Sequence, residues 1–156
     1  MGPTPLVPPK DRIEKRRRWM SVLAQADSED VLAFWERYPN KPDYTILQGP
    51  DTGLVMVQAC TENRNGRFFL GEVTVTKCVV ALRQGTVGVS MILGRRPRHA
   101  EIAAVLDAEL QDSSKNSHLM ETLVEPLAKR RHEAERREAV RVASTRVDFM
   151  TMVRGE

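Results

Sequence analysis

The chain has 156 residues and carries 24 Lys and Arg against 21 Asp and Glu, which gives a net charge of +3. This length suits one domain with a sizeable core, and the near balance of charge argues against a general polyanion-binding protein. Residues 1–10 lack the apolar centre of a signal peptide, and no later apolar run is long enough to cross a membrane. We therefore expect a cytoplasmic protein. Cys60 and Cys78 fall in predicted strands, where we expect small core residues in a reducing compartment, without a disulfide.

The N-terminal region predicts a tail followed by two helices. Prolines dominate residues 1–10, so we expect a disordered tail there and a single α+β domain over 11–156. Asp11 and Ser28 are suitable helix caps. Arg17, Arg18 and Trp19 lie in the first helix. They indicate either a solvated face with one tryptophan packed on the core or a basic and aromatic contact surface for a partner.

The middle of the chain predicts a sheet. Four runs, 44–48, 54–60, 68–82 and 86–93, have strand character and are joined by short turns, including the strong turn signal at 49–53. Short connections predict a four-stranded antiparallel meander, packed by N-terminal and C-terminal helices. The apolar run 54–60 predicts burial on both faces, and Gly71 predicts a bulge. In the last strand, the alternation of larger and smaller residues predicts a core face formed by Val87, Val89, Met91 and Leu93.

An arginine-rich turn separates that strand from the next helix. Arg95, Arg96 and Arg98 surround Pro97, which favours the first helical position. Cations beside the positive end of a helix cost about 0.3–1 kcal/mol each when exposed, and a bound anion reverses the sign of that interaction. The sequence therefore predicts an anion site formed by Arg95, Arg96, Arg98 and His99. The alternatives are a solvated basic turn or arginines paired with carboxylates elsewhere.

His99 and Glu101 are weak candidates for catalytic residues. His99 lies at the edge of an apolar helical stripe, which favours a structural histidine. The alternative is a functional histidine that acts as a general acid or donates a hydrogen bond to a phosphate group. The His-x-Glu of zinc deaminases is present at 99–101, but the Pro-Cys-x-x-Cys that accompanies it is absent. No Walker loop, GxGxxG or GxSxG is found, so we expect no metal and no cofactor bound by this chain.

The C-terminal third contains a charged helix and then an apolar end. Residues 129–138 are almost wholly charged and predict a solvated helix that leaves the core. Residues 145–156 turn apolar again and predict an extended segment covered by its own sheet or by another protein. The residues assigned to a partner interface are Arg17, Arg18, Trp19, Arg146, Val147, Phe149, Met150, Met152, Val153 and Arg154.

Several segments resemble the PhnG family, the G subunit of the bacterial carbon–phosphorus lyase system. The resemblance covers nearly the whole chain after the proline tail. Its segments are 18–24, 52–55, 71–76, 94–95 with 99–101, and 145–149 with 151–155. Three positions depart from the family pattern: Arg96 replaces an aspartate, Met150 a phenylalanine and Glu156 an aspartate. The first makes the arginine turn more basic than expected and weakens any role that needed a carboxylate there.

This resemblance implies an accessory subunit of a core complex, with PhnH, PhnI, PhnJ, PhnK and PhnL as partners and two copies per complex. The complex uses MgATP as co-substrate. An alkylphosphonate displaces adenine at the ribose 1-position, which gives a ribose 1-phosphonate 5-triphosphate. The family places the nucleosidase chemistry on the I subunit and carbon–phosphorus cleavage on the J subunit, so the isolated chain is expected to be inactive.

Two other functions stay open from the residues themselves. The chain could be a lone enzyme that uses His99 and Glu101 on a phosphorylated substrate. It could also be a small basic module that binds phosphate or nucleic acid without a catalytic role. Turnover by the isolated chain distinguishes the first, and salt-dependent binding to random DNA distinguishes the second.

Overall fold

The computed structural model describes residues 9–60 and 66–144. The elements follow the chain in this order: α1 (Lys10–Gln25), α2 (Ser28–Arg37), β1 (Tyr44–Cys60), β2 (Arg67–Leu82), β3 (Val87–Leu93), α3 (Pro97–Leu110), α4 (Ser113–Leu119), the π-helical turn η1 (Met120–Val124) and α5 (Glu125–Ser144). The predicted tail at 1–10 lies mostly outside the described residues, and Lys10 already belongs to α1. None of the described helices is both long and apolar enough to cross a bilayer.

The described part of the chain forms an α+β fold in which one antiparallel sheet has the strand order β1-β2-β3. This confirms the predicted class but not the four strands. The segment 44–60 is one strand, because the predicted turn at 49–53 does not reverse the chain. Register shifts between Ile46 and Gln48 and between Gln48 and Asp51 absorb the additional residues while pairing with β2 continues. A strong glycine–proline turn signal was thus accommodated as an irregularity inside a strand.

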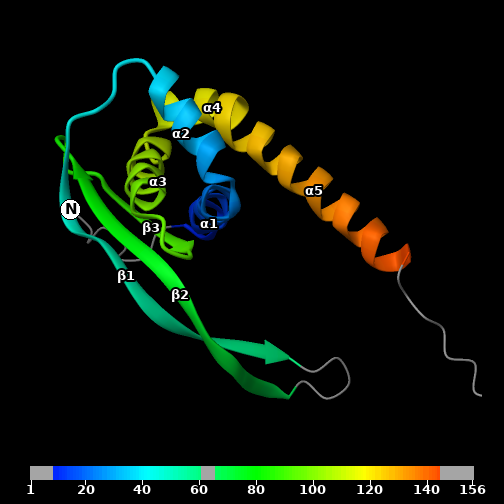
Figure 1. Cartoon of the computed structure of the whole chain (residues 1–156). Coiled ribbons are helices and arrows are strands. Elements are labelled where there is room, and N and C mark those ends of the chain that lie inside the picture. The colour runs from blue at the N-terminus through cyan, green and yellow to red at the C-terminus, as the bar shows by residue number, and fades with distance from the viewer. Residues whose placement is uncertain (1–8, 61–65, 145–156) are drawn as a thin grey trace, which may run out of the picture.

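Helix α3 is the centre of the fold. Apart from Glu101, every residue from His99 to Leu110 is buried. α3 packs on the sheet, while α1, α2 and α4 surround it from the other side (Figure 1). Gly88 of β3 allows this close approach, because a Cβ at that position would lie 1.9 Å from the backbone oxygen of Ala104. The helix therefore contacts the strand backbone directly.

The face of β3 that packs on α3 is the opposite of the predicted one. Gly88, Ser90 and Ile92 are buried, whereas Met91 and Leu93 are exposed. The prediction placed the larger side chains inside. It failed because α3 requires small residues at the point of closest approach. Since side chains alternate between the two faces of a strand, burial of Gly88 and Ser90 places Met91 and Leu93 on the exposed face.

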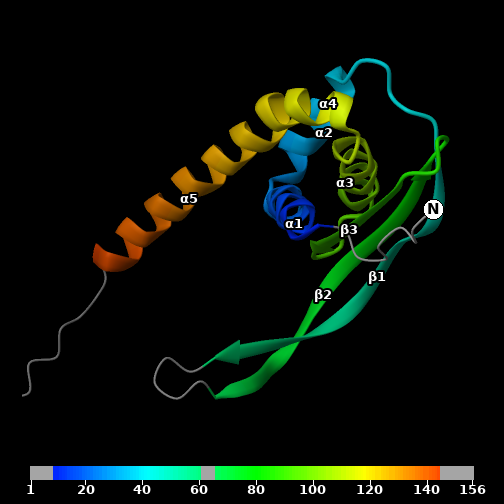
Figure 2. The ribbon, with the colours of Figure 1, turned by 180° about the vertical axis from the view of Figure 1, so that it is seen from behind.

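Two elements project from the compact part of the molecule. β1 and β2 continue as a long twisted hairpin beyond the helices, and α5 extends away from them (Figures 1 and 2). The prediction that 54–60 is buried on both faces is wrong, since Leu54, Val55 and Met56 are exposed. Cys60 is also exposed, whereas Cys78 is buried, and both are free thiols. The register shift beside Gly71 confirms the predicted bulge.

The charged helix agrees with its prediction. Leu127 is buried, but all residues from His132 to Ser144 are exposed. Pro126 lies in the first turn of α5, directly after η1. The predicted extended segment at 145–156 lies outside the described residues.

Candidate functional site

The buried polar residues of α3, beginning with His99, bind the elements that surround this helix. Its Nε2 donates to the carbonyl oxygen of Leu23 at 2.9 Å, because a carbonyl can only accept. The neutral ring then accepts at Nδ1 from the Ser28 hydroxyl at 3.0 Å. Burial lowers the pKa of His99 below its ordinary value of 6.5. His99 therefore joins the end of α1 to the start of α2 and is a structural residue, so it is removed from the anion-site candidates.

Asp107 holds α1 and β3 against α3. Its carboxylate accepts from Arg16 Nε at 3.1 Å and Arg16 Nη2 at 2.7 Å. Trp19 Nε1 donates at 2.9 Å, and the backbone N–H of Val89 donates at 2.9 Å. The carboxylate is fully buried yet receives four donors, which is the condition for a stable buried charge.

The two glutamates of α3 also bind neighbouring elements, although the buried Oε1 of Glu109 has no hydrogen-bond partner among the described residues. Glu109 Oε2 accepts from the Tyr38 hydroxyl at 3.0 Å and from Lys115 Nζ at 2.7 Å, so it ties α2 to the start of α4. Glu101 accepts from the Tyr44 hydroxyl at 2.6 Å and from Arg98 at 3.1 Å. Glu101 and His99 thus bind different neighbours, and the structure does not bring them together as a catalytic pair.

The arginine turn lies where the sequence predicted it, at the start of α3. The Thr76 hydroxyl of β2 donates to the Gly94 carbonyl at 2.7 Å and accepts from the Arg96 N–H at 3.0 Å, so it fixes the turn on the sheet. Arg98 is paired with Glu101. Arg95 and Arg96 are exposed, and no carboxylate of the described residues forms an ion pair with either. Of the predicted anion ligands, Arg95 and Arg96 are therefore the two whose guanidinium groups can still bind an anion.

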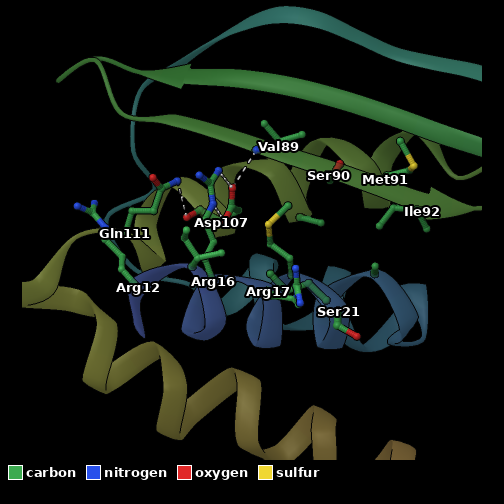
Figure 3. Close-up of a pocket in the computed structure, with 15 residues that line it drawn as sticks. Arg12, Arg16, Arg17, Ser21, Val89, Ser90, Met91, Ile92, Asp107 and Gln111 are labelled. Atoms are coloured by element: carbon green, nitrogen blue, oxygen red, sulfur yellow. Dashed lines mark hydrogen bonds and ion pairs between the residues drawn. The ribbon is translucent and has the colours of Figure 1, made fainter. Parts of the chain in front are cut away.

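A groove with a volume of about 840 Å³ lies between α1 and β3 (Figure 3). Apolar side chains of both elements line it, including Met20 and Met91. Three arginines of α1 also line it, and Arg16 is already paired with Asp107. Arg12 and Arg17 have no ion pair among the described residues. The groove therefore combines an apolar lining with positive charge.

The predicted basic and aromatic contact surface on α1 is divided among three environments. Arg17 lines the groove, Arg18 pairs with Glu125 of α5 at 2.7 Å, and Trp19 is buried against Asp107. Successive helical residues point in different directions, so a run in sequence is not a patch in space. Trp19 consequently belongs to the core, which was the other interpretation of this segment. The remaining predicted interface residues, Arg146 to Arg154, lie outside the described residues.

Sequence reasoning missed the groove and the exposed part of the hairpin. Residues of α1 and β3 meet about 70 positions apart in the chain, and no local pattern signals such a pairing. The hairpin residues did carry a signal, since a wholly apolar strand needs cover on both faces. The prediction placed this apolar run in the interior of the chain's own fold, whereas in the structure the run lies at the surface.

The chain is similar to a known protein family and to a named bacterial protein. Residues 14–155 match the family described as phosphonate metabolism protein PhnG. A protein of Rhizobium meliloti (strain 1021), the alpha-D-ribose 1-methylphosphonate 5-triphosphate synthase subunit PhnG, is 39% identical over 144 residues, which cover 92% of each chain. The similarity thus spans the arginine turn, all of α3 and both projecting elements.

Proposed function

Because the chain belongs to the PhnG family, we propose that it is an accessory subunit of an alpha-D-ribose 1-methylphosphonate 5-triphosphate synthase in phosphonate catabolism. In this assembly an alkylphosphonate replaces adenine on MgATP. The observation that carries the proposal is the 39% identity to a subunit of that synthase along 92% of both chains. The subunits PhnH, PhnI, PhnJ, PhnK and PhnL are the proposed partners, with two copies of this chain per complex.

The interior of α3 supports an accessory role. The buried titratable residues of α3 are His99, Asp107 and Glu109, and these residues and the partly buried Glu101 are each hydrogen-bonded to a neighbouring element. A general acid or base must reach the substrate with a free proton position. Such groups here serve to hold helices together, so we assign the chemistry to other subunits.

Coexpression with the other subunits tests the proposal. We expect the chain to copurify in a particle much larger than its own 17.7 kDa. We also expect adenine release from MgATP and methylphosphonate by the assembly and none by the isolated chain. A chain that stays alone, or that binds random DNA with a steep salt dependence instead, contradicts the proposal.

We also propose that Arg95 and Arg96 contact an anionic group in the assembly. The first-turn amides of α3 have no intrahelical acceptors and the helix dipole favours an anion at this end. Thr76 keeps the turn in place, and Arg98 is held by Glu101. The source of the anion could be the triphosphate of the substrate or an acidic partner.

Arg95→Ala combined with Arg96→Ala tests this assignment. We expect at least a tenfold weaker affinity of the assembled complex for ATP, since guanidinium–phosphate pairs are strong hydrogen bonds. Arg83→Ala is the control, because Arg83 is also an exposed arginine, lies in the turn between β2 and β3 and forms an exposed ion pair with Asp43. An unchanged affinity for ATP in the double variant eliminates a substrate contact, and lost assembly assigns the arginines to a partner.

The C-terminal segment is proposed as an interface. As an extended strand, the segment would place Val147, Phe149, Thr151 and Val153 on one face and Met150 and Met152 on the other. Deleting 146–156 should abolish assembly and leave the unfolding midpoint of the domain unchanged. A truncated chain that still assembles overturns this part of the proposal.

A further inference from the structure

The distal part of the β1–β2 hairpin is apolar and exposed on both faces. Leu54 and Met56 share one face of β1, and Val55 lies on the other, because successive strand residues alternate. Phe68 and Phe69 likewise follow one another on β2. The exposed fractions run from 39% for Val55 to 68% for Leu70. We call this region the hairpin arm; its exposed apolar residues are Leu54, Val55, Met56, Phe68, Phe69 and Leu70.

The hairpin arm has no support from the rest of the described chain. β3 pairs with β2 along Val75 to Ala81, and the Gly94 N–H donates to the Thr74 carbonyl at 2.8 Å, so residues 67–73 pair with β1 alone. The arm continues beyond the helices in both views (Figures 1 and 2). A lone two-stranded hairpin is marginally stable in water. Contact with an extended surface of a partner would stabilise the hairpin arm.

The arm carries few of the features that keep free strands soluble. Residues 53–60 and 68–71 contain no charged residue and no proline, and the charged residues of the paired segment are Arg67, opposite Cys60, and Glu72, opposite Met56. Natural free edges usually carry lysine, proline or charges that face inward, and apolar patches of this extent mark interaction sites. The surface that covers the arm must therefore be mainly apolar, with polar groups where it meets Arg67 and Glu72.

Two possible occupants fit poorly. A second copy that pairs through the strand edge covers neither face, and a second copy that stacks its own arm on this one covers a single face of each. The segment 145–156 of the same chain has 12 residues. As one extended strand it spans at most about 40 Å and is one strand wide, so it covers an edge or a strip of one face. Neither occupant covers both faces.

We infer that the hairpin arm inserts into a mainly apolar slot of a different subunit of the synthase, which contacts both of its faces. This inference rests on the proposed function, because it requires a larger partner. It identifies Phe69 and Leu70 on one strand and Leu54 and Met56 on the other as anchors. Large aromatic and aliphatic side chains in desolvated pockets supply most of the binding energy of such contacts.

Phe69→Asp combined with Leu70→Asp tests the inference in the full chain, coexpressed with the other subunits. We expect at least a tenfold loss of copurified complex. Val140→Asp is the matched control, because Val140 is 71% exposed but isolated on the charged helix α5; its complex should form in the wild-type amount. The unfolding midpoint of the isolated double variant should equal that of the wild type, since these side chains project away from the core.

Hydrogen exchange of the wild-type chain gives a second measurement that does not depend on any variant. Amides of residues 53–60 and 67–73 should become at least tenfold more protected on assembly. Unchanged protection overturns the inference, as does normal assembly of the double variant. If the isolated chain is a dimer that the two aspartates dissociate, the arm binds a second copy and the inference is overturned. If deletion of 145–156 lowers the protection of the arm amides in the isolated chain, the arm binds that segment and the inference is likewise overturned. If the wild-type chain does not assemble at all, the proposed function fails and takes this inference with it.

Discussion

Asp107 on α3 and Arg16 on α1 form a two-pronged ion pair across 91 positions of sequence, with contacts of 2.7 and 3.1 Å. The carboxylate is buried, while a third of the arginine side chain reaches the groove. The same carboxylate binds Trp19 and the edge of β3. One side chain thus fixes the position of a helix and a strand relative to α3.

Replacing Asp107 with alanine should destabilise the fold strongly. The change leaves the Trp19 and Val89 donors and the Arg16 charge without their acceptor, and breaking a buried pair in this way costs about 3–5 kcal/mol. Urea unfolding followed by circular dichroism measures the loss. Arg17→Ala, on the exposed side of the same helix, should change the free energy of unfolding by no more than about 0.5 kcal/mol. Equal stability of the Asp107 variant and the wild type contradicts the assigned role.

His99 should make the stability depend on pH. Its pKa is lowered in the folded protein by burial, so the unfolded chain binds a proton first as the pH falls. The free energy of unfolding should therefore decrease as the pH drops through the ordinary value of 6.5, and this term is fully present only above that value. Urea unfolding between about pH 7.5 and 5.5 tests it. The slope should be smaller in His99→Gln, and an identical slope in both proteins contradicts the buried neutral imidazole.

Tyr38 should remain protonated far into the alkaline range. Burial, followed by the charge of Glu109, raises the pKa of Tyr38 to about 12. The folded state then holds its proton more tightly than the unfolded state, so stability falls as the pH rises above 10 towards 12. Ultraviolet titration of wild type and Tyr38→Phe resolves this residue. Ionisation of both tyrosines near pH 10 would disprove the contact with Glu109.

Gly88→Ala tests how closely α3 approaches the sheet. The added methyl group meets the Ala104 carbonyl and the Ala108 backbone nitrogen, so the helix must move. Overpacking of this kind costs about 1–3 kcal/mol or more. Gly53→Ala is the matched control in β1, the other edge strand of the same sheet, because a Cβ there has no atom within 4 Å. If both variants unfold at the same urea concentration, the close approach at Gly88 is wrong.

The sequence predicted the elements better than their contacts. Pro97 and the spacing of 100–111 located α3 almost to the residue, because capping and helical periodicity are local properties. Gly49 and Pro50 misled the strand count, since the pairing of β1 with β2 on both sides outweighed the local turn preference. The face of β3 was inverted for a related reason: the partner helix selected Gly88 and Ser90, not the larger residues.

The candidate site shows the same division. Arg95 and Arg96 could be proposed as anion ligands from the sequence because the helix start marked by Pro97 directly follows them, and this assignment stays a prediction. His99 could not be separated from a catalytic histidine, because its two partners, Leu23 and Ser28, lie more than 70 positions away. The apolar run at 54–60 was recognised as needing cover, but a single sequence does not tell whether the covering surface belongs to the same chain.

One measurement addresses the accessory role most directly: adenine release from MgATP and methylphosphonate by complexes assembled with the wild-type chain or with Glu101→Gln. Glutamine preserves an acceptor for Tyr44 but has no carboxylate to exchange a proton. The account predicts normal assembly, an unchanged turnover number and no activity of the isolated chain. A complex that forms in normal yield but has lost turnover, or adenine release by the chain alone, would contradict it.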